Sequence, residues 1–243
     1  MMLASSNPAV RQCVMAYLDD LVVFSNTVEE HAEQLKQVMA MLSRHGLKLK
    51  LSKCTFAVTR TKYLGHILDG TGVHVDPEYV KGVAEMPSPT SVKELQSFLG
   101  LCGYYRRFIS SYSDIAQPLY ALLRRDASWV WTETQAEAVN QLKLALTSAP
   151  VLVMPDYSKR FIIQTDASTN GVGAVLAQTH VVDGKEVDLP VAFISRSLKP
   201  AEKNYSVTHL ELLGVMFAVK QFRHYVLGSN FLIQTDHVLY MAL

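Results

Sequence analysis

The sequence has little cysteine and no long apolar run, and both shortages narrow the kind of protein it can encode. Its three cysteines, Cys13, Cys54 and Cys102, are an odd number without metal-type spacing. We therefore expect a reducing compartment and no disulfide framework. No apolar run approaches membrane-spanning length and no secretory signal opens the chain, which predicts an intracellular protein, cytoplasmic or nuclear, without a membrane partner. A phosphate-cradling glycine loop is also missing, which argues against an unrelated Mg²⁺ phosphotransferase.

A net charge of +1 conceals an uneven distribution of charge along the 243 residues. Between Lys36 and Arg125 there are thirteen Lys and Arg against six Asp and Glu, whereas the rest of the chain has ten against sixteen. A basic middle between acidic flanks fits a nucleic-acid track between metal-binding centres. The alternative is ordinary scatter of surface charge. The length allows one large domain or two ordinary ones, and 49% hydrophobic residues can supply a sizeable core.

Two adjacent aspartates, Asp19 and Asp20, separate two short apolar runs, residues 14–18 and 21–24. Each run is typical of a buried strand, so the aspartates fall at a hairpin tip. Two carboxylates this close repel each other, and a divalent cation such as Mg²⁺ removes the conflict. The alternative is that the pair simply forms a polar turn.

The remaining pattern predicts helices in the first part and a strand-rich second part, with a boundary near residue 150. Thr27 with Glu30, and Ser91 with Glu94, form capping boxes. Expected helices cover residues 27–46, a short stretch from 76, 91–109, 132–146 and 207–226. Expected strands cover residues 55–58, 63–68, 161–165, 173–178, 191–195 and 231–235.

Residues 161–166 and 231–236 nearly repeat one another, and each copy ends in an aspartate, Asp166 or Asp236. If the two strands are parallel and adjacent, the carboxylates converge at one edge of the sheet, where ligand sites of α/β sheets lie. Glu211 sits in a strongly apolar helix, where an unpartnered buried carboxylate is costly. A metal shared with Asp166 and Asp236 would supply the partner. The alternative is a partly exposed helix glutamate.

In the helix after Ser91, the residues Gln96, Gly100 and Tyr104 recur every four positions and share one face. A glycine inside a helix costs about 1 kcal/mol relative to alanine, so some contact should compensate. Close approach to a nucleic-acid groove would do so. The alternative is tight helix–helix packing at Gly100.

The order of motifs resembles the polymerases of gypsy-type LTR retrotransposons from about residue 13 to the end. The shared motifs are Tyr17-Leu18-Asp19-Asp20, Glu29-Glu30-His31, Leu47-Lys48-Leu49-Lys50, Ser52-Lys53-Cys54, Tyr63-Leu64-Gly65-His66, Ser97-Phe98-Leu99-Gly100, Gly103-Tyr104-Tyr105-Arg106-Arg107-Phe108, Thr165-Asp166-Ala167-Ser168 and Thr235-Asp236-His237. Several long motifs in one order make the resemblance highly specific.

For the first part, the resemblance implies a reverse-transcriptase palm and thumb. Asp19 and Asp20 would be catalytic ligands of Mg²⁺, with Mn²⁺ as the alternative cofactor, and deoxynucleoside triphosphates would be the substrates. It also implies contacts with an RNA template and a DNA primer, and places Lys53 near the triphosphate. The implied nucleic-acid-binding residues are Tyr17, Leu64, Gly65, Gln96, Gly100, Tyr104, Arg106 and Arg107. For each, the alternative is a structural or solvated surface residue.

For the second part, the resemblance implies a ribonuclease H-like domain that cleaves the RNA of an RNA–DNA hybrid. Asp166, Glu211 and Asp236 match three of its catalytic metal-binding acids. The fold class is α+β for the palm and thumb, followed by a mixed α/β ribonuclease H-like domain. The expected divisions are 1–86 for the palm, 87–150 for the thumb and connection, and 151–243 for the ribonuclease H-like domain.

The chain also departs from the family pattern, which usually has a further palm aspartate upstream and a fourth ribonuclease H carboxylate downstream. Because both sites look incomplete, we expect weak or no activity from the isolated polypeptide. In the family, the parent is a polyprotein that also carries protease and integrase. A catalytically dead retrotransposon remnant that binds nucleic acid is the alternative function.

Overall fold

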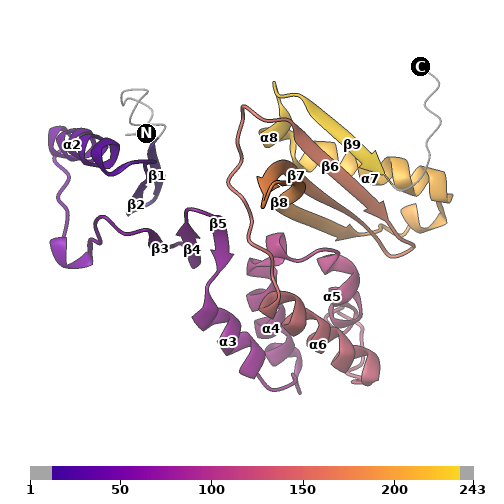
Figure 1. Cartoon of the computed structure of the whole chain (residues 1–243). Coiled ribbons are helices and arrows are strands. Elements are labelled where there is room, and N and C mark those ends of the chain that lie inside the picture. Colours follow the sequence, from indigo (N-terminus) through magenta and orange to yellow (C-terminus); the bar gives the residue numbers. More distant parts are fainter. Residues whose placement is uncertain (1–12, 236–243) are drawn as a thin grey trace. The chain divides into compact units, whose positions relative to one another are not determined.

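The computed structural model describes residues 13–235, and these divide between two compact units, residues 1–70 and 71–243 (Figure 1). Each unit is described by itself. Mixed helices and strands in both units confirm the predicted fold class. No helix within residues 13–235 is both long and apolar enough to cross a bilayer.

The first unit starts with an antiparallel hairpin of β1 (Val14–Tyr17) and β2 (Asp20–Val23), followed by helix α2 (Val28–Arg44). The Thr27 side chain caps α2 by accepting a hydrogen bond from the Glu30 N–H, as the capping box predicted. A small core packs one face of the hairpin against α2; it consists of Cys13, Val14, Val38, Met41 and Leu42. The prediction of buried strands was wrong in part, because only Val14 of the two strands is buried. A two-stranded ribbon covered by one helix leaves its other face exposed.

A second hairpin follows the short 3₁₀ turn η2 (Leu51–Lys53), and it consists of β3 (Arg60–Tyr63) and β4 (His66–Asp69). Two sequence predictions were wrong here. Residues 55–58 form no strand, and residues 63–68 are the tip of a hairpin rather than one strand. Leu64 and Gly65 have φ of 47° and 69°, and a two-residue turn with positive φ at both positions reverses the chain.

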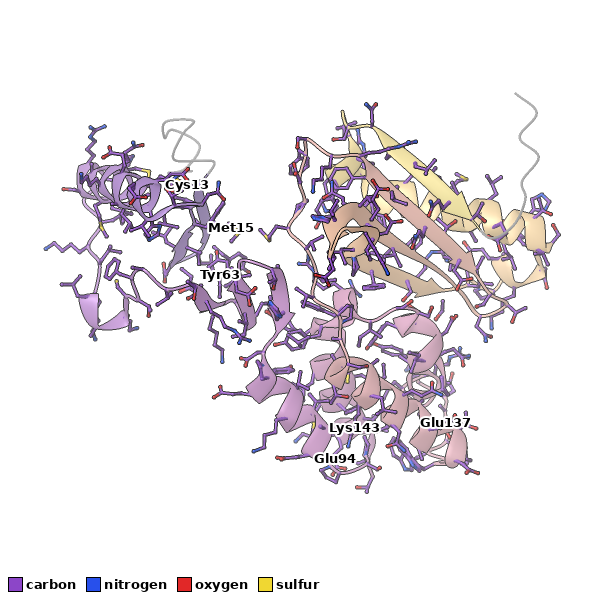
Figure 2. All side chains as sticks on the ribbon, viewed as in Figure 1. Cys13, Met15, Tyr63, Glu94, Glu137 and Lys143 are labelled. Carbon is purple, nitrogen blue, oxygen red and sulfur yellow. The ribbon has the colours of Figure 1, made fainter. Side chains whose placement is uncertain are left out.

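The second unit starts with strand β5 (Gly72–Val75) and a group of helices: α3 (Pro77–Glu85), α4 (Val92–Tyr104), α5 (Tyr112–Ala121) and α6 (Glu133–Thr147), with the 3₁₀ turn η3 (Arg106–Phe108) after α4. Helix α4 was predicted to reach residue 109, but it ends earlier because the fully buried Tyr105 turns inward against Tyr79 and Phe108. Helix α5 was not predicted. The side chain of Lys143, labelled on α6 in Figure 2, donates to the carbonyl oxygens of Ala84 and Met86 and so fastens α6 to the end of α3.

The rest of the second unit is a four-stranded sheet in the order β8-β7-β6-β9, formed by β6 (Phe161–Ala167), β7 (Gly171–Val182), β8 (Lys185–Ser197) and β9 (Phe231–Thr235). After the turn η4 (Glu202–Asn204), helix α7 (Val207–Gln221) packs on β6 and β7, and the short helix α8 (Arg223–Val226) follows (Figure 1). The core between sheet and helix includes Phe161, Ile163, Leu176, Ala218 and Phe222. Predicted strands and helix are all present, with β7 and β8 longer than expected.

Candidate functional site

The Asp19-Asp20 pair lies at a hairpin tip, as predicted. Tyr17 pairs with Asp20, so Leu18 and Asp19 form the turn, and Leu18 adopts a left-handed φ of 51°. Both aspartates are exposed, and Tyr17 is 57% exposed. The turn therefore exposes two adjacent carboxylates and an aromatic ring. Side chains so exposed can contact a ligand and add little to the packed core.

Within the same unit, Asp20 acts electrostatically on Tyr63 at the end of β3. Burial is the main cause that raises the pKa of the Tyr63 hydroxyl, and the Asp20 carboxylate raises it further. The fold thus places the predicted metal-binding hairpin near the hairpin that carries Leu64 and Gly65. Lys53 lies in η2 and is exposed.

Helix α4 presents Gln96, Gly100 and Tyr104 on an exposed face, while its opposite face is buried through Leu95, Phe98, Leu99 and Cys102. Within residues 13–235, and apart from the neighbouring backbone of α4 itself, no atom would lie within 4 Å of a Cβ added at Gly100. The alternative of tight helix packing at this glycine is therefore wrong. Tyr104 is half-exposed, and its ring is held edge-on at 4.9 Å from Tyr105.

Arg106 and Arg107 follow α4 in η3, where Arg106 is exposed and Arg107 is partly buried. The Arg107 guanidinium lies 6.0 Å from the centroid of the Phe108 ring. Both arginines follow the C-terminal end of α4 in the chain, and cations of this kind can contact a phosphate.

The strands β6 and β9 are parallel neighbours, and Thr165 pairs with Thr235 at their C-terminal ends. This register meets the condition under which the sequence repeat brings its aspartates to one edge of the sheet. Asp166 follows Thr165 and is exposed. Asp236 and His237 lie outside the described residues.

Glu211 extends from α7 into the same end of the sheet. It is only 5% exposed, and its Oε2 accepts a hydrogen bond from the Thr235 hydroxyl at 3.3 Å. One turn further along α7, a Cβ added at Gly214 would lie 3.8 Å from the Asp166 carbonyl oxygen. The absence of a side chain there lets α7 approach β6 closely, so Glu211 is carried to the strand end that bears Asp166.

A further acidic residue, Asp114 of α5, reaches this region and was missed in the sequence. Its Oδ2 accepts a hydrogen bond from the Ser168 hydroxyl at 3.0 Å, and burial raises its pKa, with Asp166 raising it further. Ser168 Oγ also accepts from the N–H groups of Asn170 and Gly171, which forms the turn between β6 and β7. Asp114 belongs to an unpredicted helix and meets a turn 54 residues away, so no local pattern could reveal it.

A cavity of about 190 Å³ opens beside Asp166. Ser110 and Ser111, from the segment before α5, line it together with Thr165 and Asp166. Carboxylate oxygens are suitable ligands for Mg²⁺. Within residues 13–235, no three His, Cys, Asp or Glu side chains group closely enough to hold a metal ion. Asp166 and Glu211 fit the donor chemistry, and their role as metal ligands remains a prediction.

Comparison with known proteins links both parts of the chain to one kind of protein. Residues 2–68 match the family described as reverse transcriptase (RNA-dependent DNA polymerase). Residues 131–233 match the RNase H-like domain found in reverse transcriptase. The retrovirus-related Pol polyprotein from transposon 297 of Drosophila melanogaster is 40% identical over 234 residues, which cover 95% of this chain and 21% of that protein. The chain belongs to the family of retrotransposon Pol polyproteins, and it contains part of their reverse transcriptase and RNase H-like domains.

Two further relatives are also polyproteins of transposons. The Pol polyprotein from transposon opus of Drosophila melanogaster is 38% identical over 91% of the chain, and the Tf2-3 polyprotein of Schizosaccharomyces pombe is 36% identical over 92%. The matches cover 23% and 17% of those two proteins. The chain thus spans about a fifth of the length of the curated relatives it matches.

Solved structures share the fold of this chain. The foamy viral protease-reverse transcriptase dRH in complex with ds DNA has a TM-score of 0.82 at 23% identity, covering 96% of this chain and 41% of that one. The foamy viral protease-reverse transcriptase in complex with RNA/DNA hybrid has a TM-score of 0.79 at 22% identity, covering 95% of this chain and 31% of that one.

Proposed function

We propose that this chain supplies part of an enzyme that copies RNA into DNA and degrades the RNA strand of the resulting hybrid. Asp19 and Asp20 would serve DNA synthesis, and Asp166, Glu211 and Asp236 would serve RNA cleavage, with Mg²⁺ or Mn²⁺ bound at each site. The expected partners are an RNA template, a DNA primer, the RNA–DNA hybrid and deoxynucleoside triphosphates. Protease and integrase would be further parts of the polyprotein.

The observation that carries the proposal is the position of Glu211. Its carboxylate is buried at the end of a parallel strand pair, in contact with Thr235 and close to β6, the strand that bears Asp166. A carboxylate is seldom buried unless it binds a cation or accepts hydrogen bonds. Asp236 directly follows Thr235 in the sequence and lies outside the described residues, so its part in this site is proposed from the sequence alone.

Asp166 and Glu211 would both hold the metal ion for RNA cleavage. A bound divalent cation would supply an activated water and would stabilise the leaving oxygen. Asp166, which is exposed, would face the hybrid, whereas the hydrogen bond from Thr235 holds the buried Glu211 in place. In the polymerase part, the exposed Asp19 and Asp20 would orient the triphosphate against the primer end.

The experiment measures binding of Mg²⁺ as well as turnover. Wild-type chain and the variants Asp166→Asn, Glu211→Gln and Asp236→Asn are heated with and without Mg²⁺, and cleavage of a labelled RNA–DNA hybrid is followed in parallel. We expect Mg²⁺ to raise the Tm of the wild type and to lose this effect in the variants, because a ligand that binds only the folded state stabilises it. Any hybrid cleavage should be lost in the same variants.

Asp183→Asn is the matched control, because Asp183 lies exposed in the turn between β7 and β8 with a left-handed φ of 51° that asparagine tolerates. It should respond to Mg²⁺ as the wild type does. Equal Mg²⁺ responses in all variants, or cleavage that survives Asp166→Asn, would refute the assignment. Primer extension on an RNA template, with Asp19→Asn and Asp20→Asn, tests the polymerase part in the same way.

A second candidate function, nucleic-acid binding without catalysis, is favoured by the exposed face of α4. Gln96 and Tyr104 lie on the same exposed face as Gly100. Among the described residues, no packing contact over Gly100 explains why a glycine stands there. Salt-dependent binding of a duplex by wild type and by the Asp166→Asn variant, with no turnover in either, would support this function.

A further inference from the structure

A cavity of about 580 Å³ opens at the N-terminal ends of β6 and β9, away from the carboxylates. One wall is the segment Tyr157, Ser158, Lys159 and Arg160, and the other is the turn of residues 228–231. The Phe161 N–H donates to the Asn230 carbonyl oxygen at 3.2 Å and joins the two walls. Nothing in the proposed catalytic sites uses this cavity.

The wall that carries the two cations is held by a buried side chain. Gln178 of β7 is 0% exposed, and its Oε1 accepts from the Asp156 N–H at 2.9 Å. Its Nε2 donates to the carbonyl oxygen of Asp156 at 2.7 Å and lies 3.5 Å from that of Lys159. A fully buried amide that bonds to an exposed loop fixes the loop before any ligand arrives, which lowers the entropic cost of binding.

The charge at this wall is available to an anion. Lys159 and Arg160 are exposed, and within residues 13–235 neither forms an ion pair with a carboxylate. The carboxylate beside them belongs to Asp156, whose Oδ1 accepts hydrogen bonds from the N–H and the hydroxyl of Ser158. Lys159 Nζ also lies 3.5 Å from Nδ1 of His180. The Asp156 carboxylate interacts electrostatically with Lys159 but forms no ion pair with it, so two cations and one carboxylate leave this wall with a net positive charge. Such a wall suits a phosphodiester.

Tyr157 adds an aromatic surface to the cavity. Its ring is 61% exposed and stands edge-on at 5.9 Å from the ring of the buried Phe161. An anchored ring with an open face can stack on a base, and aromatic rings beside cations are the combination found in single-strand binding grooves. Bases in a duplex are already stacked on each other and are not available to such a ring.

We propose that this cavity binds single-stranded nucleic acid, with phosphates at Lys159 and Arg160 and a base on Tyr157. The proposal rests on the proposed function for its class of ligand, but it needs no catalysis. Arg160 and Asp166 are six residues apart on or beside one strand, or about 20 Å at the rise of an extended chain. Binding at the cavity can therefore be measured separately from chemistry at the carboxylates.

The experiment follows binding of a fluorescently labelled 20-nucleotide oligodeoxythymidine by anisotropy, in EDTA and over a range of salt concentrations. The double variant Lys159→Ala with Arg160→Ala should bind more weakly, and its slope of log K against log salt should be smaller by about 1.4, at about 0.7 for each lost phosphate contact. Tyr157→Ala should weaken binding about fivefold or more through lost stacking, whereas Tyr157→Phe should retain it.

The matched control is Lys199→Ala with Lys203→Ala, which removes the same charge from exposed positions after the C-terminal end of β8. If this control lowers affinity and slope as much as the cavity variant, attraction is general and the proposal is wrong. Photocrosslinking of a bromouridine-substituted strand to the unaltered protein gives a second measurement. Crosslinks at Tyr157 support the proposal, and crosslinks confined to other segments overturn it. If the wild type binds the single strand at this cavity but does not cleave the RNA–DNA hybrid, the proposed function is wrong and the cavity proposal stands.

Discussion

The hydroxyl of Ser168 donates a hydrogen bond to the carboxylate of Asp114 at 3.0 Å, joining the β6–β7 turn to helix α5. The other carboxylate oxygen, Oδ1, is buried and has no hydrogen-bond partner among the described residues. A second contact runs in parallel, since the Ser113 N–H donates to the Ser195 hydroxyl at 2.9 Å. Helix α5 is thereby fastened to the strands next to Asp166, so the helical and sheet parts of this unit support one another.

A double-mutant cycle tests this contact. Asp114→Ala and Ser168→Ala should each lower the free energy of unfolding by about 1–2 kcal/mol, because each breaks a hydrogen bond to a charged group. The double variant should cost less than the sum of the two single changes. Urea denaturation of the four proteins measures the coupling, with Asp126→Ala as an exposed control. Strict additivity would show that the two side chains do not interact in solution.

Two glycine substitutions should have opposite effects on stability. A Cβ at Gly171 would lie 2.4 Å from Asp114 Oδ1 and 2.9 Å from the Arg196 carbonyl oxygen, so Gly171→Ala should destabilise the protein by about 1–3 kcal/mol. Gly100→Ala meets open space within α4 and should stabilise it by up to about 1 kcal/mol.

If the exposed face of α4 contacts a duplex, Gly100→Ala should also weaken duplex binding while it raises the Tm. Thermal melts and anisotropy with a labelled RNA–DNA hybrid measure the two effects on one sample. Unchanged duplex affinity would remove Gly100 from the binding surface.

Glu202 should make stability depend on acidic pH. Its carboxylate is bonded by Arg196 at 2.7 and 3.1 Å and by the Lys199 N–H at 2.8 Å, and these contacts, the Arg196 bond foremost, lower its pKa. A lowered pKa in the folded state gives stability that is present above the ordinary glutamate pKa and is lost as pH falls through the folded value.

Glu202→Gln should therefore lower the free energy of unfolding near neutral pH by about 1–3 kcal/mol, and the difference from wild type should shrink as the pH is lowered below about 4. Urea midpoints measured from pH 3 to pH 7 test this. A difference that stays constant with pH would mean that the ion pair does not perturb Glu202.

Asp20→Asn should lower the pKa of Tyr63 without restoring its ordinary value, since burial is the larger cause of the shift and remains. Ring-labelled tyrosine followed by NMR through alkaline pH gives the titration, and Tyr63→Phe assigns the signal. Glu33→Gln, an exposed change on α2, should leave the Tyr63 pKa unaltered. If the Tyr63 pKa were also unaltered in Asp20→Asn, the two hairpins would not be close in solution.

Local sequence patterns predicted the regular elements well where one feature dominated. The similar residues 161–165 and 231–235 predicted two strands in the correct places, and the Thr27 cap predicted the start of α2. Predictions failed where the local pattern was ambiguous. Residues 63–68 read as one strand because their composition suits a strand, but positive φ at Leu64 and Gly65 turns the chain.

The order of motifs determined the family by itself, since each motif is a short contiguous string that requires no contact to be recognised. The sequence also determined that Asp20 and Asp166 stand at or near the ends of strands, because a short apolar run next to an aspartate involves only neighbouring residues. Only the tertiary structure decided that Gly100 faces open space, that Asp114 meets Ser168 and that Gln178 holds the loop of Lys159. Such contacts join residues that are distant along the chain, and they depend on how whole elements pack rather than on the residues beside each one.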